Sequence, residues 1–161
     1  MAVIEIADLN SERDGRAVLE LLNEYAVDIA GGGEPLSAHT REHLIGELRK
    51  RLGCRVVLAF EDDEPAGLAI CFEAFSTFKC QPILNIHDFT VAPRFRGRGI
   101  AKAMLSRIEE LALEQDCGKL TLEVLEGNEV ARRLYAGVGF KGYELDPKMG
   151  HALFLEKVLA E

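Results

Sequence analysis

The chain has 161 residues, of which 48% are hydrophobic and 29% charged, and its 27 acidic and 19 basic residues leave a net charge of −8. This length fits one folded domain, predicted to span residues 1–161, and the composition excludes a disordered chain. The negative charge argues against binding to nucleic acid and weakly favours a cationic partner.

The N-terminus and the cysteines indicate the compartment. Residues 1–10 contain no basic segment followed by an apolar block, and no run approaches the 18 apolar residues of a membrane span. We therefore expect a cytoplasmic protein without membrane contact. The four cysteines form no C-x-x-C pair, so the usual spacing of a zinc or redox site is missing. We expect reduced, mostly buried thiols at Cys54, Cys71, Cys80 and Cys117.

In the first half of the chain, hydrophobic periodicity predicts a strand, two helices and a hairpin. Residues 3–9 alternate as a strand, and a helix with Ser11 as its N-cap follows, with Val18, Leu21, Leu22 and Tyr25 on its apolar face. The glycines and proline of GGGEPLS, residues 31–37, end this helix and predict a mobile loop. A second helix is expected over residues 39–51, and EDDEP joins two hairpin strands, 54–60 and 66–75.

In the second half, strands and helices alternate. We expect a strand at 83–91, a long helix ending near Gln115, a strand at 119–125, a helix at 128–138, and closing strands at 139–145 and 151–159. The order of these elements predicts an α/β fold with a mixed, mostly antiparallel central sheet flanked by helices.

The stretch VAPRFRGRGIAKAML, residues 91–105, has the pattern of an anion-binding turn. A glycine-rich turn between a strand and a helix leaves backbone N–H groups unpaired, and the helix dipole adds partial positive charge there. Gly97 and Gly99 allow a bulky phosphate to approach the backbone, and the guanidinium groups of Arg94, Arg96 and Arg98 raise the local positive potential. The predicted ligand is a phosphate or pyrophosphate.

Two nucleotide-binding motifs also bind phosphate with a glycine-rich turn before a helix, but both fit this chain poorly. A Walker A loop requires G-x-x-x-x-G-K-[ST], and this spacing does not occur. The dinucleotide pattern G-x-G-x-x-G is met by Gly97 and Gly99, but its third position is Lys102, where close packing requires Gly or Ala. The turn also lies late in the chain rather than in a first β-α-β unit.

Two segments resemble the GNAT family of N-acetyltransferases. VAPRFRGRGIA is similar to the family's acyl-CoA loop, [QR]-x-x-G-x-[GA], matched by Arg94, Gly97 and Gly99. About 30 residues later, NEVARRLYAGVGF resembles the second segment of the family, in which an Asn precedes a helix that ends in Tyr and is followed by Gly-Phe. The resemblance covers roughly residues 83–143, and LNIHDFTV and KMGHALFLEKVL look most similar to the polyamine and thialysine acetyltransferase branch.

This resemblance implies direct transfer of an acetyl group from acetyl-CoA, without a metal, to the primary amine of a small molecule. Tyr135 would be the acid that protonates the departing CoA thiolate, and a homodimer is the default of the branch. The implied cosubstrate-binding residues are Phe89, Thr90, Val91, Arg94, Arg96, Gly97, Arg98, Gly99, Ile100, Ala101, Lys102, Asn128, Arg132 and Tyr135. Asn is also a favoured N-cap, and a tyrosine at this helix position also suits a core edge, so structural roles for Asn128 and Tyr135 stay open.

Two neighbouring residues, His87 and Asp88, are the candidates for the general base. Polyamine-acetylating members carry a carboxylate where this chain has His87, followed by the shared Asp88. Strand alternation puts the two side chains on opposite faces of the sheet unless a bulge intervenes. Histidine titrates in a suitable range, but a single strand histidine is as often structural as catalytic.

The acceptor site is predicted around three further residues. The loop 31–37 has a glycine hinge and offers the carboxylate of Glu34, so it would fold over the substrate, although an ordinary surface connection has the same pattern. FSTFKCQ, residues 75–81, would form the opposite wall through Phe75, unless its phenylalanines belong to the core. Tyr25 completes the predicted acceptor residues.

One helical segment matches a zinc-binding motif. HTREH, residues 39–43, matches the zinc motif H-x-x-E-H but lacks a third ligand, so we favour a solvated helix face.

Within the acetyltransferase interpretation, a protein N-terminus or lysine is the rival acceptor. A CoA-binding regulatory module without turnover is the alternative from another class.

Overall fold

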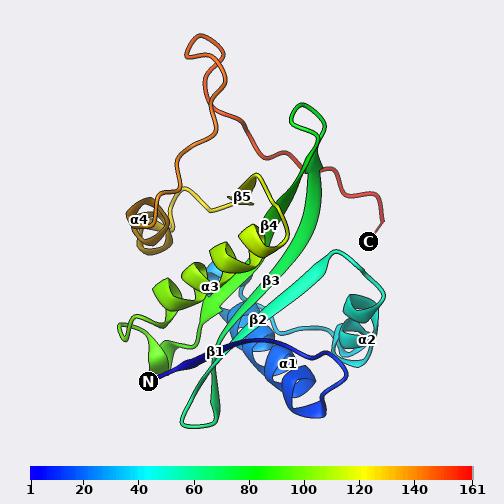
Figure 1. The fold of residues 1–161 in the computed structure, drawn as a ribbon. Coiled ribbons are helices and arrows are strands. Elements are labelled where there is room, and N and C mark those ends of the chain that lie inside the picture. Colours follow the sequence, from blue (N-terminus) through cyan, green and yellow to red (C-terminus); the bar gives the residue numbers. More distant parts are fainter. Residues whose placement is uncertain (161) are drawn as a thin grey trace. The chain divides into compact units, whose positions relative to one another are not determined.

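The computed structural model describes residues 1–160, and its internal contacts divide the chain into two compact units, Met1–Leu122 and Glu123–Glu161 (Figure 1). The single domain over residues 1–161 stays a prediction. The first unit contains β1 (Val3–Ile6), α1 (Glu12–Val27), the 3₁₀ turn η1 (Ile29–Gly31), α2 (Ala38–Arg49), β2 (Cys54–Glu61), β3 (Glu64–Ser76), β4 (Gln81–Val91), the 3₁₀ turn η2 (Pro93–Phe95), α3 (Ile100–Glu114) and β5 (Lys119–Leu122).

The first unit is a five-stranded sheet in the order β1-β2-β3-β4-β5 with helices on both faces (Figure 1). The pairs are antiparallel except β4 and β5, which are parallel. A Cβ on Gly67 of β3 would meet Met104 of α3, whereas the charge of Asp88 on β4 acts on Tyr25 of α1, a helix that contacts β4. Asp88 pairs with Ile70, which is three residues from Gly67 on β3, so Gly67 and Asp88 point to opposite faces of the sheet. α3 and α1 therefore cover opposite faces. The expected mixed, mostly antiparallel fold is confirmed.

Local signals account for most of these elements. Ser11 accepts from the N–H of Asp14 and starts α1, as predicted. Asp62 and Asp63 adopt φ angles of 52° and 63° between β2 and β3, the conformation of a tight hairpin turn. The apolar face of α3 is buried against the sheet as Ile100, Met104, Leu105, Ile108, Leu111 and Ala112.

Gly67 is required where β3 passes beneath α3. A Cβ at this position would lie 2.5 Å from Met104 Sδ and 3.3 Å from Thr90 O. Gly67→Ala is therefore expected to lower the free energy of unfolding by about 1–3 kcal/mol, measured by urea denaturation. Gly46→Ala, in α2 where the added Cβ meets only Arg49 Nη2 at 3.9 Å, is the control and should be neutral or stabilising. Equal stability of Gly67→Ala and the wild type would contradict this packing.

α1 ends at Val27, earlier than the predicted loop at 31–37 implied, and the segment that follows it is hydrogen-bonded to the helix. Gly31 belongs to η1, and a Cβ there would overlap the carbonyl oxygen of Tyr25. The N–H of Gly33 donates to Ala26 O at 3.0 Å, and the N–H of Leu36 donates to Asn23 Oδ1 at 3.0 Å. These backbone N–H groups lie outside the helix but still find hydrogen-bond acceptors in the last turns of α1.

The second unit contains α4 (Glu129–Gly137), close to the predicted helix 128–138. The closing strands predicted at 139–145 and 151–159 were wrong, because the described part of this unit shows a single bridge between Glu144 and His151. β5 likewise ends at Leu122 instead of residue 125. Alternating apolar residues form a strand only where a neighbouring strand accepts their backbone hydrogen bonds, and the bridge offers one such position.

The cysteines are free thiols, as expected, but differ in exposure. Cys71 and Cys117 are buried, Cys54 is half-buried, and Cys80 is exposed at the turn after β3. Burial raises the pKa of Cys71 to about 12, so its thiol stays protonated at neutral pH. Across residues 1–160, no helix has the length and apolar character needed to span a membrane.

Candidate active site

The turn before α3 presents open backbone. Gly97 and Gly99 have φ angles of 77° and 81°, and an added Cβ on either would have no atom within 4 Å. α3 starts at Ile100 without a side-chain cap. Within residues 1–160, no acceptor bonds the N–H groups from Gly97 to Lys102. These amides and the helix dipole together make an anion-binding position.

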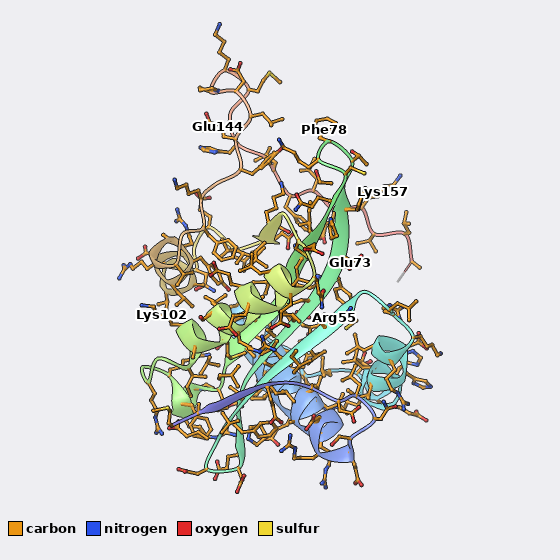
Figure 2. All side chains as sticks on the ribbon, in the orientation of Figure 1. Arg55, Glu73, Phe78, Lys102, Glu144 and Lys157 are labelled. Carbon is orange, nitrogen blue, oxygen red and sulfur yellow. The ribbon has the colours of Figure 1, made fainter. Side chains whose placement is uncertain are left out.

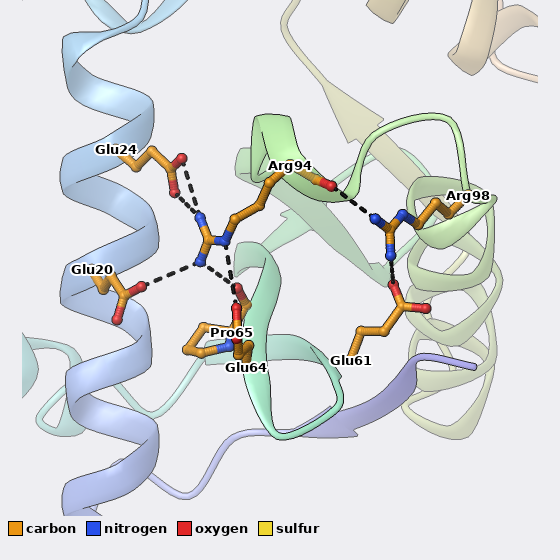
Figure 3. A network of polar contacts seen from close by, with 7 residues as sticks. All are labelled: Glu20, Glu24, Glu61, Glu64, Pro65, Arg94 and Arg98. Atoms are coloured by element: carbon orange, nitrogen blue, oxygen red, sulfur yellow. Dashed lines mark hydrogen bonds and ion pairs between the residues drawn. The ribbon is translucent and has the colours of Figure 1, made fainter.

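Arg94 is held by carboxylates of α1 and of the β2–β3 hairpin (Figure 3). Its Nη1 lies 3.1 Å from Glu24 Oε2, and its Nη2 lies 3.4 Å from Glu20 Oε1. The guanidinium also lies 3.8 Å from Glu64 Oε2 and donates to Pro65 O at 3.2 Å. Arg94 therefore ties the loop to α1 and to the start of β3.

The other two loop arginines also have carboxylate partners. Arg98 Nη1 lies 3.3 Å from Glu61 Oε2, and its Nη2 donates to Arg94 O at 3.2 Å (Figure 3). Arg96 Nη2 lies 3.6 Å from Asp28 Oδ2. The positive potential expected from the three arginines is thus offset by carboxylates in this conformation.

These carboxylates were not among the predicted site residues. Glu20, Glu24 and Asp28 are spaced four residues apart, a pattern that places acidic groups along one side of a helix and its end. That spacing was the available signal, but it does not indicate which basic residues the side faces.

Lys102 differs from the three arginines. It lies in the first turn of α3, where its side chain is exposed (Figure 2), and within residues 1–160 no carboxylate pairs with it. Its neighbours Ile100 and Ala101 are buried and half-buried. Of the predicted loop residues, Lys102 is therefore the one whose charge is not already offset.

β4 continues beyond its parallel partner. Its register with β5 ends at the pair Ile86 and Leu122, whereas β4 runs on to Val91. The predicted pantetheine-contacting residues Phe89, Thr90 and Val91 occupy this extension, where β3 still pairs on the other side. The side chains of Thr90 and Val91 are buried, so a ligand there would meet their backbone.

A β-bulge at His87 changes the relation between the two candidate bases. Ile70 of β3 pairs with Asp88, and Cys71 pairs with Ile86, so His87 is the extra residue. The His87 ring lies edge-on to Phe72, with 5.4 Å between ring centroids. Since Phe72 and Ile70 share a face of β3, the bulge brings His87 and Asp88 to that same face.

Asp88 is a half-buried carboxyl group whose negative charge acts on Tyr25. Burial raises the pKa of Asp88, and the nearby His87 opposes this shift. Burial, together with the negative charges of Asp88 and Asp28, raises the pKa of Tyr25. A carboxylate with a raised pKa is a better proton acceptor than an exposed one, so this cluster is suited to general base chemistry on a cation.

The other predicted acceptor residues lie apart. Phe75 pairs with Pro82, six positions along β4 from Asp88, which corresponds to roughly 15–20 Å along the strand. Phe75 is 56% exposed near the turn that carries Phe78 (Figure 2), so the structure does not bring it to Asp88. Glu34 is exposed in the segment that is hydrogen-bonded to α1.

The remaining predicted residues lie on α4, in the second unit. Asn128 caps the helix, accepting the N–H of Ala131 at 3.2 Å, which confirms its capping role. Arg132 Nη1 donates to Glu126 O at 3.0 Å. Tyr135 is buried, with its ring edge-on to Phe140 at 5.8 Å between centroids.

The zinc motif does not assemble a site. The rings of His39 and His43 stack at 4.3 Å between centroids, and His43 Nδ1 lies 2.9 Å from His39 O. In the part of the chain that the structure describes, no group of three or more His, Cys, Asp or Glu side chains is arranged to hold a metal ion.

Comparison with known proteins agrees with this geometry. Residues 15–140 match the sequence profile of the Acetyltransferase (GNAT) family. A thialysine N-epsilon-acetyltransferase of Caenorhabditis elegans is 33% identical over 97 residues, which are 58% of this chain and 60% of that protein. An uncharacterized N-acetyltransferase of Archaeoglobus fulgidus is 35% identical over 104 residues, 62% of this chain and 71% of that protein.

A solved structure supports the fold. The structure of a transcriptional regulator from Bacillus halodurans C-125 matches with a TM-score of 0.79 at 19% identity, covering 98% of this chain and 100% of the other. With the profile match over most of the chain, the family expected from the two sequence segments is confirmed. The chain belongs to the acetyltransferase (GNAT) family.

Proposed function

We propose that this protein is an N-acetyltransferase that transfers an acetyl group from acetyl-CoA directly to the primary amine of a small molecule. The main support for this proposal is that one unit contains both the open amides of Gly97 to Lys102 and the half-buried carboxyl group of Asp88. The family match supports acetyl-CoA as cosubstrate, and the thialysine enzyme among the relatives supports a small amine. A cytoplasmic location and a homodimer are parts of the same proposal.

The loop before α3 and the extension of β4 are the proposed binding site for acetyl-CoA. The pyrophosphate would accept hydrogen bonds from the amides of Gly97 to Lys102, and the Lys102 ammonium would add a charge-assisted contact. The pantetheine arm would run along the backbone of Phe89 to Val91, beyond the end of β5. Arg94 and Arg98 would hold the loop in shape through their carboxylates.

The chemistry requires one proton acceptor and one proton donor. An alkyl ammonium has a pKa of about 10.4, so a base must remove a proton before the nitrogen can attack the thioester carbonyl. Asp88, with His87 beside it, would take that proton. The new C–N bond forms as the C–S bond breaks, and Tyr135 would protonate the departing thiolate, whose free-thiol pKa is about 8.5. The second proton that the nitrogen loses on becoming an amide would restore the phenol of Tyr135.

The first experiment is release of free CoA from acetyl-CoA across thialysine, polyamines, amino acids, aminoglycosides and peptides. Turnover on one class of small amine supports the proposal and names the acceptor. Turnover on peptides alone would favour the protein-directed alternative. Acetyl-CoA binding without turnover on any member would favour a regulatory module, and the fold shared with a transcriptional regulator makes that outcome worth the test.

Gly99 tests the cosubstrate loop. Ala in its left-handed conformation costs about 1–2 kcal/mol, and the added Cβ projects into the open side of the loop, where the pyrophosphate is proposed to bind. Gly99→Ala is expected to raise the KM for acetyl-CoA about tenfold, equivalent to about 1.4 kcal/mol. Gly150→Ala is the matched control, since its φ of 74° imposes the same strain. An equal change in KM in both variants would contradict a specific role of Gly99.

A further inference from the structure

Arg96 joins the acetyl-CoA loop to the end of α1. Its Nε donates to Val91 O at 3.0 Å, and its Nη2 lies 3.6 Å from Asp28 Oδ2. The side chains of Arg96 and Asp28 are 53% and 31% exposed, so their ion pair is solvated and weak. Arg94, in contrast, has three carboxylate partners. Arg96 is therefore free to exchange its partner at little cost.

Asp28 connects the loop with the acceptor side of the sheet. Its carboxylate accepts the N–H of Ala30 at 3.0 Å, and its carbonyl accepts the N–H groups of Gly31 and Gly33, so it anchors the segment that leads to Glu34. Arg96 bonds both Asp28 and Val91 O, so the Asp28 carboxylate lies near the end of β4, three residues beyond Asp88. Asp28 is thus a second acidic group near the β4 extension that carries the proposed base.

An anion on the loop would change the partner of Arg96. Arg96 directly precedes Gly97, the first of the open amides, so a bound pyrophosphate brings negative charge next to the guanidinium. Arginine makes shorter and stronger bonds with phosphate than a solvated carboxylate at 3.6 Å provides. Once Arg96 turns to the phosphate, the Asp28 charge is no longer offset.

We propose that Asp28 is a second ammonium-binding carboxylate of the acceptor site, which Arg96 neutralises until the cosubstrate occupies the loop. The inference rests on the proposed function. It makes the cosubstrate and a cationic amine bind with positive coupling, and linkage requires that each improves the affinity of the other by the same factor. The amine then binds best after acetyl-CoA.

The test uses n-butylamine as a minimal ammonium probe and CoA in place of acetyl-CoA, so that no turnover occurs. The full chain, labelled with ¹⁵N, is titrated with n-butylamine with and without saturating CoA, and the Kd is taken from amide chemical shifts. CoA is expected to lower the Kd of the wild type about fivefold or more. Arg96→Gln should bind the amine tightly in both conditions, and Asp28→Asn weakly in both.

The variants are conservative. Asn retains the capping of Ala30, and Gln retains a donor that can reach Val91 O, so both are expected to fold. Arg107→Gln, whose arginine pairs with Glu110 and Glu114 on α3, and Asp63→Asn, at the β2–β3 turn, are the charge-matched controls and should keep the wild-type response.

Calorimetric titration of the protein with CoA alone distinguishes failure of this inference from failure of the proposed function. CoA binding with an amine Kd that does not respond to CoA overturns the inference and leaves the acetyltransferase proposal intact. A response that persists in Arg96→Gln or Asp28→Asn overturns it as well. If CoA does not bind the wild type, the proposed function fails, and the inference fails with it.

Discussion

Tyr135→Phe is expected to lower kcat by about 10²–10⁴-fold while the affinity for CoA stays within about twofold of the wild type. The substitution removes the phenolic proton that would go to the CoA thiolate and keeps the ring that lies edge-on to Phe140. The buried ring should preserve the packing of α4, so the thermal midpoint of the variant should stay close to that of the wild type. The measurement combines steady-state kinetics with calorimetric titration of CoA.

Tyr143→Phe is the matched control for this prediction. Tyr143 is the other tyrosine of the second unit and is 55% exposed, so the same atom is removed from a residue without a proposed role. Its kcat should equal that of the wild type. Full activity of Tyr135→Phe would show that the thiolate leaves without this acid, and Tyr135 would then be a core-edge residue.

Asp88→Asn is expected to lower kcat about 10²-fold or more, because Asn cannot accept the proton of the ammonium. The pKa of Asp88 is raised by burial, so in the wild type the rate should increase with pH above the ordinary range of an aspartate. The variant should lack this acidic limb. His87→Gln, measured in parallel, separates the two neighbours: a larger loss in this variant than in Asp88→Asn would assign the base to His87.

The same substitution should stabilise the fold at neutral pH. A raised folded pKa means that the folded state binds the proton more readily than the unfolded state, so stability is lost as pH rises through the folded pKa. Asn carries no such charge. The thermal midpoint of Asp88→Asn should exceed that of the wild type at pH 7–8, and the gain should vanish near the ordinary aspartate pKa of about 3.9. A lower midpoint across this range would show that the carboxylate is stabilised by its surroundings.

The sequence alone determined those features whose causes are local. Ser11 and Asn128 cap their helices through side chains that reach the first turn, and the apolar periodicity of α3 marks its buried face. Gly97 and Gly99 leave the backbone before α3 open, as their lack of a Cβ indicated. The family followed from two short-range patterns, the glycine spacing of this loop and the segment NEVARRLYAGVGF.

Only the tertiary structure decided the contacts between distant segments. Arg94 meets Glu20 and Glu24 across 70 or more residues, and nothing in a local pattern indicates this pairing. The bulge at His87 depends on the register of β4 with β3, which no property of LNIHDFTV alone specifies. The last two predicted strands failed for a related reason, since their alternating residues indicate a strand but cannot supply its partner.

The division has one physical reason. Caps, turns and helix faces arise from interactions within a few residues, so the sequence written in a line already contains both partners. Ion pairs, β-bulges and shared electrostatic fields join residues that only the folded chain brings together. The loop that would bind acetyl-CoA belongs to the first class. Arg96, Asp28 and Asp88, through which that loop would act on the acceptor, belong to the second.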